Sequence, residues 1–150
     1  KKIVFYSEGI RGIKRTIINK EDDKKIITQV YMDSSDNVIG ESFDKIEPFE
    51  DGIAIVKPRK RGWGTMNRFG LYQMDTKYQK IVRMNDNLLK AIVTGQRGLG
   101  DLKGNILIPP KYDELEYINR NYMYKLTKND RIGYYKLGDK PAWIWEIKEE

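Results

Sequence analysis

The sequence predicts an all-β protein, built as a tandem array of about four antiparallel repeats of about 35 residues, each with about three short strands. The main observation is a tetrad of aromatic, polar, charged and aliphatic residues that recurs at positions 43–46, 78–81 and 112–115. The second observation is that no segment keeps the i, i+3, i+4 apolar spacing of a helix for more than one turn. The array is expected to be solenoid-like or a curled meander.

Three further markers recur in phase with the tetrads. An apolar residue precedes glycine at Trp63-Gly64, Leu99-Gly100 and Ile132-Gly133. A small, turn-compatible residue lies upstream of each tetrad, at Ser35, Gly70 and Gly104, and a large apolar residue lies downstream, at Phe49, Met84 and Tyr117. Four markers that keep one period over three units indicate true repeats.

Each unit is predicted to be β structure along its length. Extended stretches at 64–67, 100–103 and 133–136 lead into turns, where Gly, Asn and Asp supply unusual φ angles. Apolar strands follow at 38–39, 71–72, 106–108 and 142–145, and the last strands are expected at 53–57, 88–93 and 122–126. Pro109-Pro110 is expected to end the strand at 106–108, because proline cannot donate to a β ladder.

The whole chain, residues 1–150, is expected to be one repeat domain. Repeats are predicted at 34–67, 68–102 and 103–136, with a C-terminal cap at 137–150. Residues 1–33 are predicted to be a degenerate N-terminal unit, because the units that cap a stack of repeats are usually atypical.

Composition excludes several kinds of chemistry. The chain has no cysteine and no histidine, which excludes disulfides, Ser-His-Asp and Cys-His nucleophiles and the usual Cys/His zinc sites. Lys+Arg 28 and Asp+Glu 22 are interspersed, whereas a nucleic-acid-binding protein usually gathers its basic residues in one stripe. No cofactor is expected.

Location is indicated only weakly by the sequence. No apolar run approaches the roughly 20 residues of a membrane span, so no transmembrane segment is expected. The first residue is Lys1 rather than Met, which favours a cell-envelope or secreted protein from which an N-terminal signal was removed. A cytoplasmic location stays open.

Acidic residues offer two candidate sites, and each has a structural alternative. Asp113, Glu114 and Glu116 could supply a glycosidase pair, but an Asp after the repeat aromatic can instead accept turn N–H groups, as Gln79 would in its unit. The acidic stretches 21–23 and 33–37 lack the glycine and closing Glu of a calcium loop, so turns are favoured. No catalytic or metal site is expected, and the protein is expected not to be an enzyme.

Two groups of residues are candidates for partner binding. Arg59, Lys60 and Arg61 could contact an anion or nucleic acid, but a solvated hairpin tip is the favoured interpretation of so short a basic run. Aromatic residues gather in the C-terminal third, and the candidates there are Tyr117, Tyr122, Tyr124, Trp143 and Trp145. Trp143 and Trp145 are expected to share one face of a strand, as are Tyr122 and Tyr124. Such a face suits protein hot spots or sugar stacking, or it caps the last unit.

The repeat markers resemble those of bacterial WG repeats. The unit of that family runs from Trp-Gly through an extended stretch and Asp-x-x-Gly to Val-Ile-Pro-Pro-x-Tyr-Asp, an aromatic residue and Gly-Leu-Ala-x-Val. Residues 99–113 match the centre of this pattern, and residues 43–64 supply the rest, including the one true Trp-Gly pair, Trp63-Gly64. The resemblance covers residues 30–146, and it departs where Leu99 and Ile132 replace tryptophan.

The resemblance implies a β-rich repeat protein without a common enzymatic activity. It favours a non-catalytic protein-binding module, of the accessory or immunity type, that blocks its partner stoichiometrically. The alternative is a carbohydrate-binding protein of the cell envelope, and the third possibility is an anion or nucleic-acid binder. A protein partner is therefore expected first and a glycan second, whereas nucleic acid is disfavoured.

Overall fold

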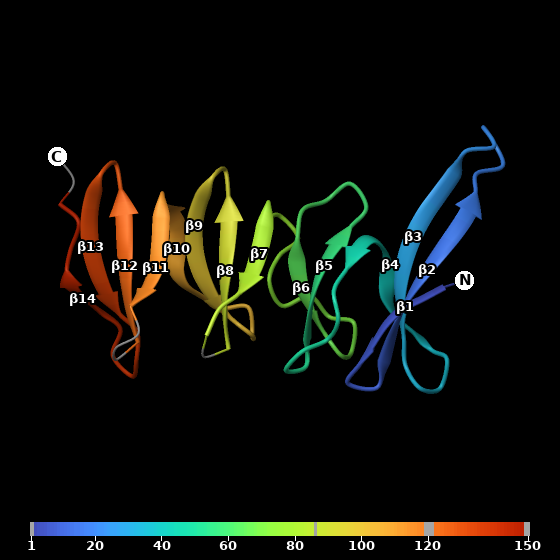
Figure 1. Ribbon diagram of the computed structural model, residues 1–150, viewed down its shortest axis with the longest axis horizontal. Coiled ribbons are helices and arrows are strands. Elements are labelled where there is room, and N and C mark those ends of the chain that lie inside the picture. Colours follow the sequence, from blue (N-terminus) through green and yellow to red (C-terminus); the bar gives the residue numbers. More distant parts are fainter. Residues whose placement is uncertain (1, 86, 119–121, 149–150) are drawn as a thin grey trace.

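The protein is a row of antiparallel β-sheets. The computed structural model describes residues 2–85, 87–118 and 122–148, and all regular elements within these ranges are β-strands. The strands form three sheets that follow one another along the longest axis (Figure 1). The prediction of an all-β repeat array is confirmed. The described residues contain no helix that is long and apolar enough to cross a membrane.

The first sheet is a six-stranded meander in chain order. Its strands are β1 (Lys2–Ser7), β2 (Ile10–Ile18), β3 (Lys25–Met32), β4 (Val38–Ile46), β5 (Ile53–Pro58) and β6 (Gly64–Asn67). Residues 71–78 lie along β6 as an irregular outer segment, because Trp63 and Tyr78 exchange backbone hydrogen bonds of 2.8 and 3.1 Å.

The second and third sheets are four-stranded meanders. The second contains β7 (Lys80–Arg83), β8 (Leu88–Val93), β9 (Gln96–Asp101) and β10 (Ile106–Tyr112). The third contains β11 (Glu114–Ile118), β12 (Met123–Lys128), β13 (Arg131–Lys136) and β14 (Ala142–Trp145). Residues 1, 86, 119–121 and 149–150 lie outside the described residues, and they fall in the predicted N-terminal unit, the second and third repeats and the C-terminal cap.

The predicted tetrads are the corners at which the chain passes from one repeat unit to the next. Tyr112 ends β10, and β11 begins in the following sheet after Asp113 alone. In β4 the same step occurs without a break, because Phe43 pairs with β3 and Ile46 pairs with Val56 of β5. The six-stranded sheet therefore holds two units that are joined through one continuous strand.

Three apolar clusters lie one after another, each around one corner aromatic. Phe43, Tyr78 and Tyr112 are only 0%, 3% and 4% exposed, and each belongs to a different cluster. Burying one large apolar side chain contributes roughly 1.5–3 kcal/mol, so each corner aromatic stabilises its own cluster. The aromatic marker of the sequence is thus a buried member of each core.

One loop geometry recurs in each repeat, directly after β3, β6 and β9. Asp33, Asn67 and Asp101 each accept two backbone N–H groups with one side-chain oxygen, at 2.9–3.1 Å. The residue with positive φ in these loops is Asp36, Gly70 or Gly104. The small-residue marker is confirmed at the two glycines, but in the first repeat Asp36 takes that conformation and Ser35 does not. The stretch 33–37 is therefore a turn, as favoured from the sequence.

Close backbone crossings explain the other glycine marker, with one correction. A Cβ at Gly64 would lie 2.7 Å from the Met74 carbonyl oxygen, and one at Gly98 would lie 2.5 Å from the Ile108 carbonyl oxygen. Gly98 is therefore the counterpart of Gly64, and the predicted equivalence of Trp63-Gly64 with Leu99-Gly100 is wrong. Residues 74–76 pass directly over Gly64 and β10 passes directly over Gly98, so only glycine leaves room at these two positions.

Pro109 and Pro110 lie inside β10, so the prediction that they end this strand is wrong. The strand continues because β10 is the edge of its sheet, where a residue without an N–H is tolerated. Register irregularities between Ile106 and Ile108, and between Ile108 and Tyr112, accompany the two prolines. The strand thereby reaches the corner at Tyr112.

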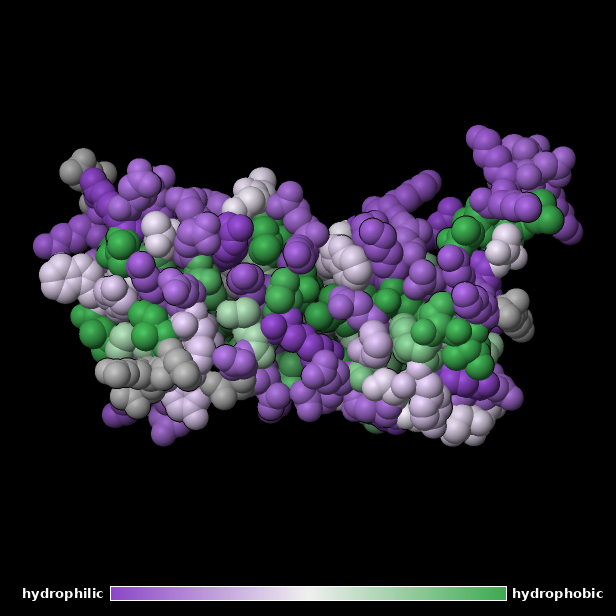
Figure 2. Space-filling model, viewed as in Figure 1, coloured by the Kyte–Doolittle hydropathy of each residue, from purple (hydrophilic) through white to green (hydrophobic). Residues whose placement is uncertain are grey.

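The β2–β3 ribbon projects beyond the first sheet (Figure 1). β1 pairs with β2 only as far as Lys14, and β4 pairs with β3 only from Gln29 onward. Residues 15–18 and 25–28 therefore have no third strand beside them in the described chain. Figure 2 shows hydrophobic surface on this ribbon, where Ile17, Ile18 and Ile27 are 49%, 59% and 51% exposed.

Candidate functional site

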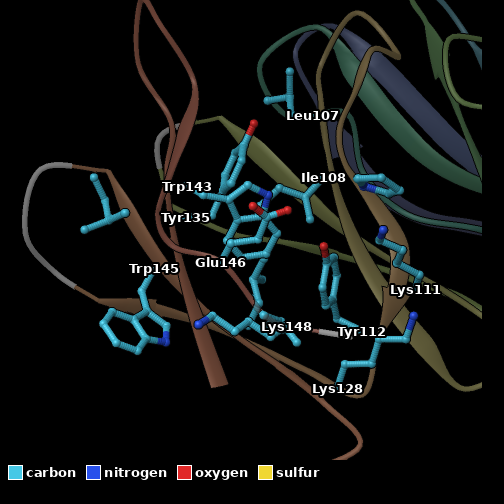
Figure 3. A pocket seen from close by; sticks show the side chains of 14 residues that line it. Leu107, Ile108, Lys111, Tyr112, Lys128, Tyr135, Trp143, Trp145, Glu146 and Lys148 are labelled. Carbon is cyan, nitrogen blue, oxygen red and sulfur yellow. The ribbon is translucent and has the colours of Figure 1, made fainter. Parts of the chain in front are cut away.

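A groove of about 890 Å³ lies between β10 and the face of the third sheet. Its apolar lining includes Ile108 and Tyr112 from β10, Leu126 from β12, Tyr135 from β13 and Trp143 from β14 (Figure 3). The corner at Tyr112 creates this groove, because it turns the chain into the third sheet while β10 stays behind as an edge. The two sides of the groove therefore come from neighbouring repeats.

Trp143 is the central aromatic residue of the groove. Its ring meets Tyr135 edge-to-face at 5.3 Å and 80°, and it meets Tyr112 at 6.2 Å and 63°. The β13–β14 ladder sets the first contact, since it pairs Tyr135 with Trp143. Edge-to-face pairs hold aromatic rings in fixed orientations. Trp143 is half-buried, so part of it is rigidly held and part faces solvent.

The border of the groove is basic. Three lysines line it, Lys111, Lys128 and Lys148, with Glu146 as the one carboxylate among the lining residues. The Lys111 ammonium lies 5.6 Å from the centre of the Tyr112 ring, a cation–π distance. The Arg131 guanidinium donates to the Lys148 carbonyl and so fixes the backbone at the end of the groove. The groove thus joins an apolar floor to a border of net positive charge.

The predicted aromatic residues are divided among different environments. Tyr124 is fully buried, and its ring lies 5.2 Å from that of the half-buried Tyr117, so these two belong to the core of the third sheet. Trp143 lies in the groove and Trp145, which is 65% exposed, lies at its border. Tyr122 is exposed and precedes β12 with a φ of 57°. That φ breaks the strand alternation that would have placed it on one face with Tyr124.

The prediction that Trp143 and Trp145 share one face is wrong. Tyr135 pairs with Trp143 and Tyr134 pairs with Trp145, and paired residues point to the same side of a sheet. Because Tyr134 and Tyr135 are consecutive, their partners lie on opposite sides. The register irregularity at this point, a bulge that includes Ile144, causes the difference. Figure 3 shows the Trp145 ring directed away from the cluster around Trp143.

The basic run lies on the hairpin between β5 and β6 of the first sheet, so the structure does not join it to the groove. Arg59 and Lys57 face the Asp44 carboxylate at 4.0 and 3.6 Å, and Arg61 pairs with Glu41. Lys60 is exposed at the tip, with a φ of 59°. Two of the three predicted cations thus have acidic partners on β4.

Tyr72 adds a third group beside the Arg61–Glu41 pair. The Arg61 guanidinium lies 5.6 Å from the centre of the Tyr72 ring. Burial, with the Glu41 carboxylate beside it, raises the pKa of the Tyr72 hydroxyl to about 12. The hydrogen bond to Glu41 likewise raises the pKa of Arg61. This cluster holds its charges in a fixed network within the protein.

The corner carboxylates have a structural role. Asp113 accepts the Asn129 N–H at 2.8 Å, and Gln79 accepts the Gly95 N–H at the same distance in the preceding unit. Both bonds tie a corner to the adjacent hairpin turn, which confirms the interpretation favoured from the sequence. Glu114 and Glu116 are exposed on β11. The described residues include no group of three or more acidic side chains placed to hold a metal ion.

A second hollow of about 760 Å³ lies between the β4–β5 turn and β7, where Trp63 lines it. Arg83 crosses it and joins two units, because it donates to the Ile53 carbonyl at 2.5 Å and lies 3.3 Å from the Glu50 carboxylate. Burial raises the pKa of Glu47 there, and the Arg83 charge partly opposes this shift. Arg83 therefore links two repeats across this hollow.

Sequence reasoning found Trp143 but missed the groove around it. Ile108, Lys111 and Tyr112 were visible only as parts of the repeat pattern, and Lys148 carried no local signal. These residues meet because a corner separates their strands into two sheets, and no short-range pattern encodes that angle. Aligning the two units on either side of one corner, and comparing the positions next to that corner, would have grouped them.

Comparison with known proteins locates the repeats along the chain. Residues 31–57 and 98–130 match a family described as WG containing repeat. Each matched stretch includes one of the Asp loops, one corner and the strand that follows it. No curated protein and no solved structure matches the chain.

Proposed function

Since the chain is a WG-containing repeat protein over residues 31–57 and 98–130, we propose that it is a non-catalytic module that binds another protein. The observation that carries the proposal is the groove between β10 and the third sheet, where a fixed tryptophan lies within a basic border. Anchored aromatic residues in a partly buried setting are typical of the residues that dominate protein binding. An accessory or immunity-type protein that occupies its partner would use such a surface.

The other function classes receive less support from the same geometry. The carboxylates that could have served a glycosidase accept turn N–H groups or lie exposed on β11. Two of the three cations that could have met an anion are paired with carboxylates, Arg59 with Asp44 and Arg61 with Glu41. The aromatic residues that could have stacked on sugar rings are divided between the core and two sides of β14.

Affinity capture from the source cells tests this proposal. The bait is the wild-type chain, compared with the double variant Lys111→Glu, Lys148→Glu and with the control Phe69→Ala. Phe69 is 87% exposed on a loop of the first sheet, away from the groove. We expect wild type and the control to retain one protein in stoichiometric amount through a high-salt wash, and the double variant to lose it.

Two results would contradict the proposal. Retention of the same protein by the double variant would place binding elsewhere on the molecule. Recovery of only nucleic acid that is released by salt would favour the basic hairpin instead, since phosphate contacts weaken steeply as salt rises.

A further inference from the structure

The apolar residues and the charged residues occupy different parts of the groove. The floor is apolar, with Ile108 only 2% exposed and Trp143 half-buried, whereas Lys111 and Lys148 are exposed at its border. Glu146 offsets only part of this positive charge. A complementary ligand therefore combines an apolar group with negatively charged groups beside it.

The size of the groove favours several residues of a polypeptide. Its volume of about 890 Å³ lies within the roughly 300–1,000 Å³ of pockets that enclose a drug-sized ligand, which is larger than one side chain. One large apolar side chain can occupy the floor near Trp143, and its neighbours along the chain would then lie beside the lysines.

The groove is bordered by the edge strands of two successive sheets. β10 is an edge strand of the second sheet although the chain continues directly into the third sheet. β14 has the equivalent position at the edge of the third sheet. Pro109 and Pro110 remove two N–H donors from β10, whereas β14, with the sequence Ala-Trp-Ile-Trp, has no proline and no charge. An unblocked edge strand is a template for an added strand.

We propose that this groove binds an extended, acidic segment of a partner protein. The segment lies along β14, seats one large apolar side chain on the floor beside Trp143, and places carboxylates toward Lys111 and Lys148. The inference rests on the proposed protein-binding function and specifies the chemistry of the segment that is bound.

Selection from a displayed library of random peptides tests the chemistry without knowledge of the natural partner. The full chain is immobilised as wild type and as the double variant Lys111→Glu, Lys148→Glu. We expect peptides selected on wild type to share an aromatic or large aliphatic residue flanked by Asp or Glu. We also expect them to bind the double variant at least tenfold more weakly.

Charge reversal separates a direct contact from a folding defect. A selected peptide in which each Asp and Glu is replaced by Lys should bind the double variant more tightly than it binds wild type. A basic or uncharged consensus, or equal binding of the acidic peptides by both proteins, would overturn the proposal.

Backbone methylation tests the extended pairing along β14. Methyl groups on alternate amide nitrogens of a selected peptide should weaken binding at least tenfold in one of the two possible phases, and the other phase should have little effect. Equal, small effects in both phases would overturn the strand-addition mode. If capture from cells finds a partner while the library shows no acidic consensus, the protein-binding function stands and this inference fails.

Discussion

Asp113 and Gln79 perform one task in successive units with different chemistry. Each lies directly after a corner aromatic and accepts an N–H from the adjacent hairpin turn at 2.8 Å. In the first corner, Asp44 instead pairs with Lys57 and Arg59 of its hairpin. The position requires an acceptor near the hairpin, and a carboxylic acid is only one way to supply it.

Substitution of Asp113 separates its acceptor role from acid chemistry. Asp113→Asn keeps the acceptor and should leave the free energy of unfolding nearly unchanged, whereas Asp113→Ala should lower it by about 1 kcal/mol. Urea unfolding of both variants checks this. Equal losses in the two variants would show that the charge of Asp113, rather than its hydrogen bond, matters.

Asp33 gives the stability a dependence on pH. Hydrogen bonds from Asn37, first from its backbone N–H, lower the pKa of Asp33 below the ordinary value. A lowered pKa in the folded state favours the ionised form, so this contribution is present above the unfolded-state pKa and is lost as pH falls through the folded-state pKa.

Replacement of Asp33 should therefore flatten the acid side of the stability curve. Asn67 holds the equivalent loop without a charge, so Asp33→Asn preserves the turn. We expect the melting temperature of wild type to fall more steeply than that of Asp33→Asn between about pH 5 and pH 2. Parallel melting curves over this range would contradict the assignment.

At the scale of the strand, the period of the sequence predicted where the strands lie better than how they pair with one another. The corner aromatics and the Asp loops could be placed from the sequence because each depends on local residue types. The passage of β10 through Pro109 and Pro110 depends on whether a strand is an edge, which is a property of the whole sheet. The bulge beside Trp143 likewise depends on cross-strand fit, so the alternation rule failed there.

Two glycines of β9 provide a direct test of the repeat alignment. A Cβ at Gly98 would collide with backbone atoms of Ile108 and Pro110 at 2.5–2.7 Å, and backbone cannot move aside cheaply. At Gly100 the nearest atom is the flexible Met74 methyl at 3.1 Å. Gly98→Ala should therefore destabilise by about 1–3 kcal/mol, clearly more than Gly100→Ala, as measured by urea unfolding. The reverse order would restore the alignment that the sequence favoured.

At the scale of the molecule, three apolar cores follow one another along the array. Repeat proteins of this kind are stabilised by each unit and by its contacts with its neighbours. Arg83 between the second and third units, and Arg97, which donates to the Asp113 carbonyl, are such contacts. The groove arises at the same scale, which is why its residues carry no shared sequence signal.

Disruption of one core should therefore destabilise mainly the sheet that surrounds it. Tyr124 is fully buried in the C-terminal cluster, so Tyr124→Ala should cost about 3–5 kcal/mol there. We expect hydrogen exchange to accelerate in β11–β14 while β3–β6 keep most of their protection. A uniform increase across all three sheets would show that the array unfolds as one unit.

The corners also bear on how such a protein could change in length. A segment that runs from one corner to the next contains its own aromatic core residue, loop and crossing glycine, and both of its ends lie at equivalent points of the backbone. Duplication of that segment by unequal recombination would insert a complete core without disturbing the sheets on either side. Each insertion would also create a new edge strand, and with it room for a further groove whose lining could diverge independently of the rest.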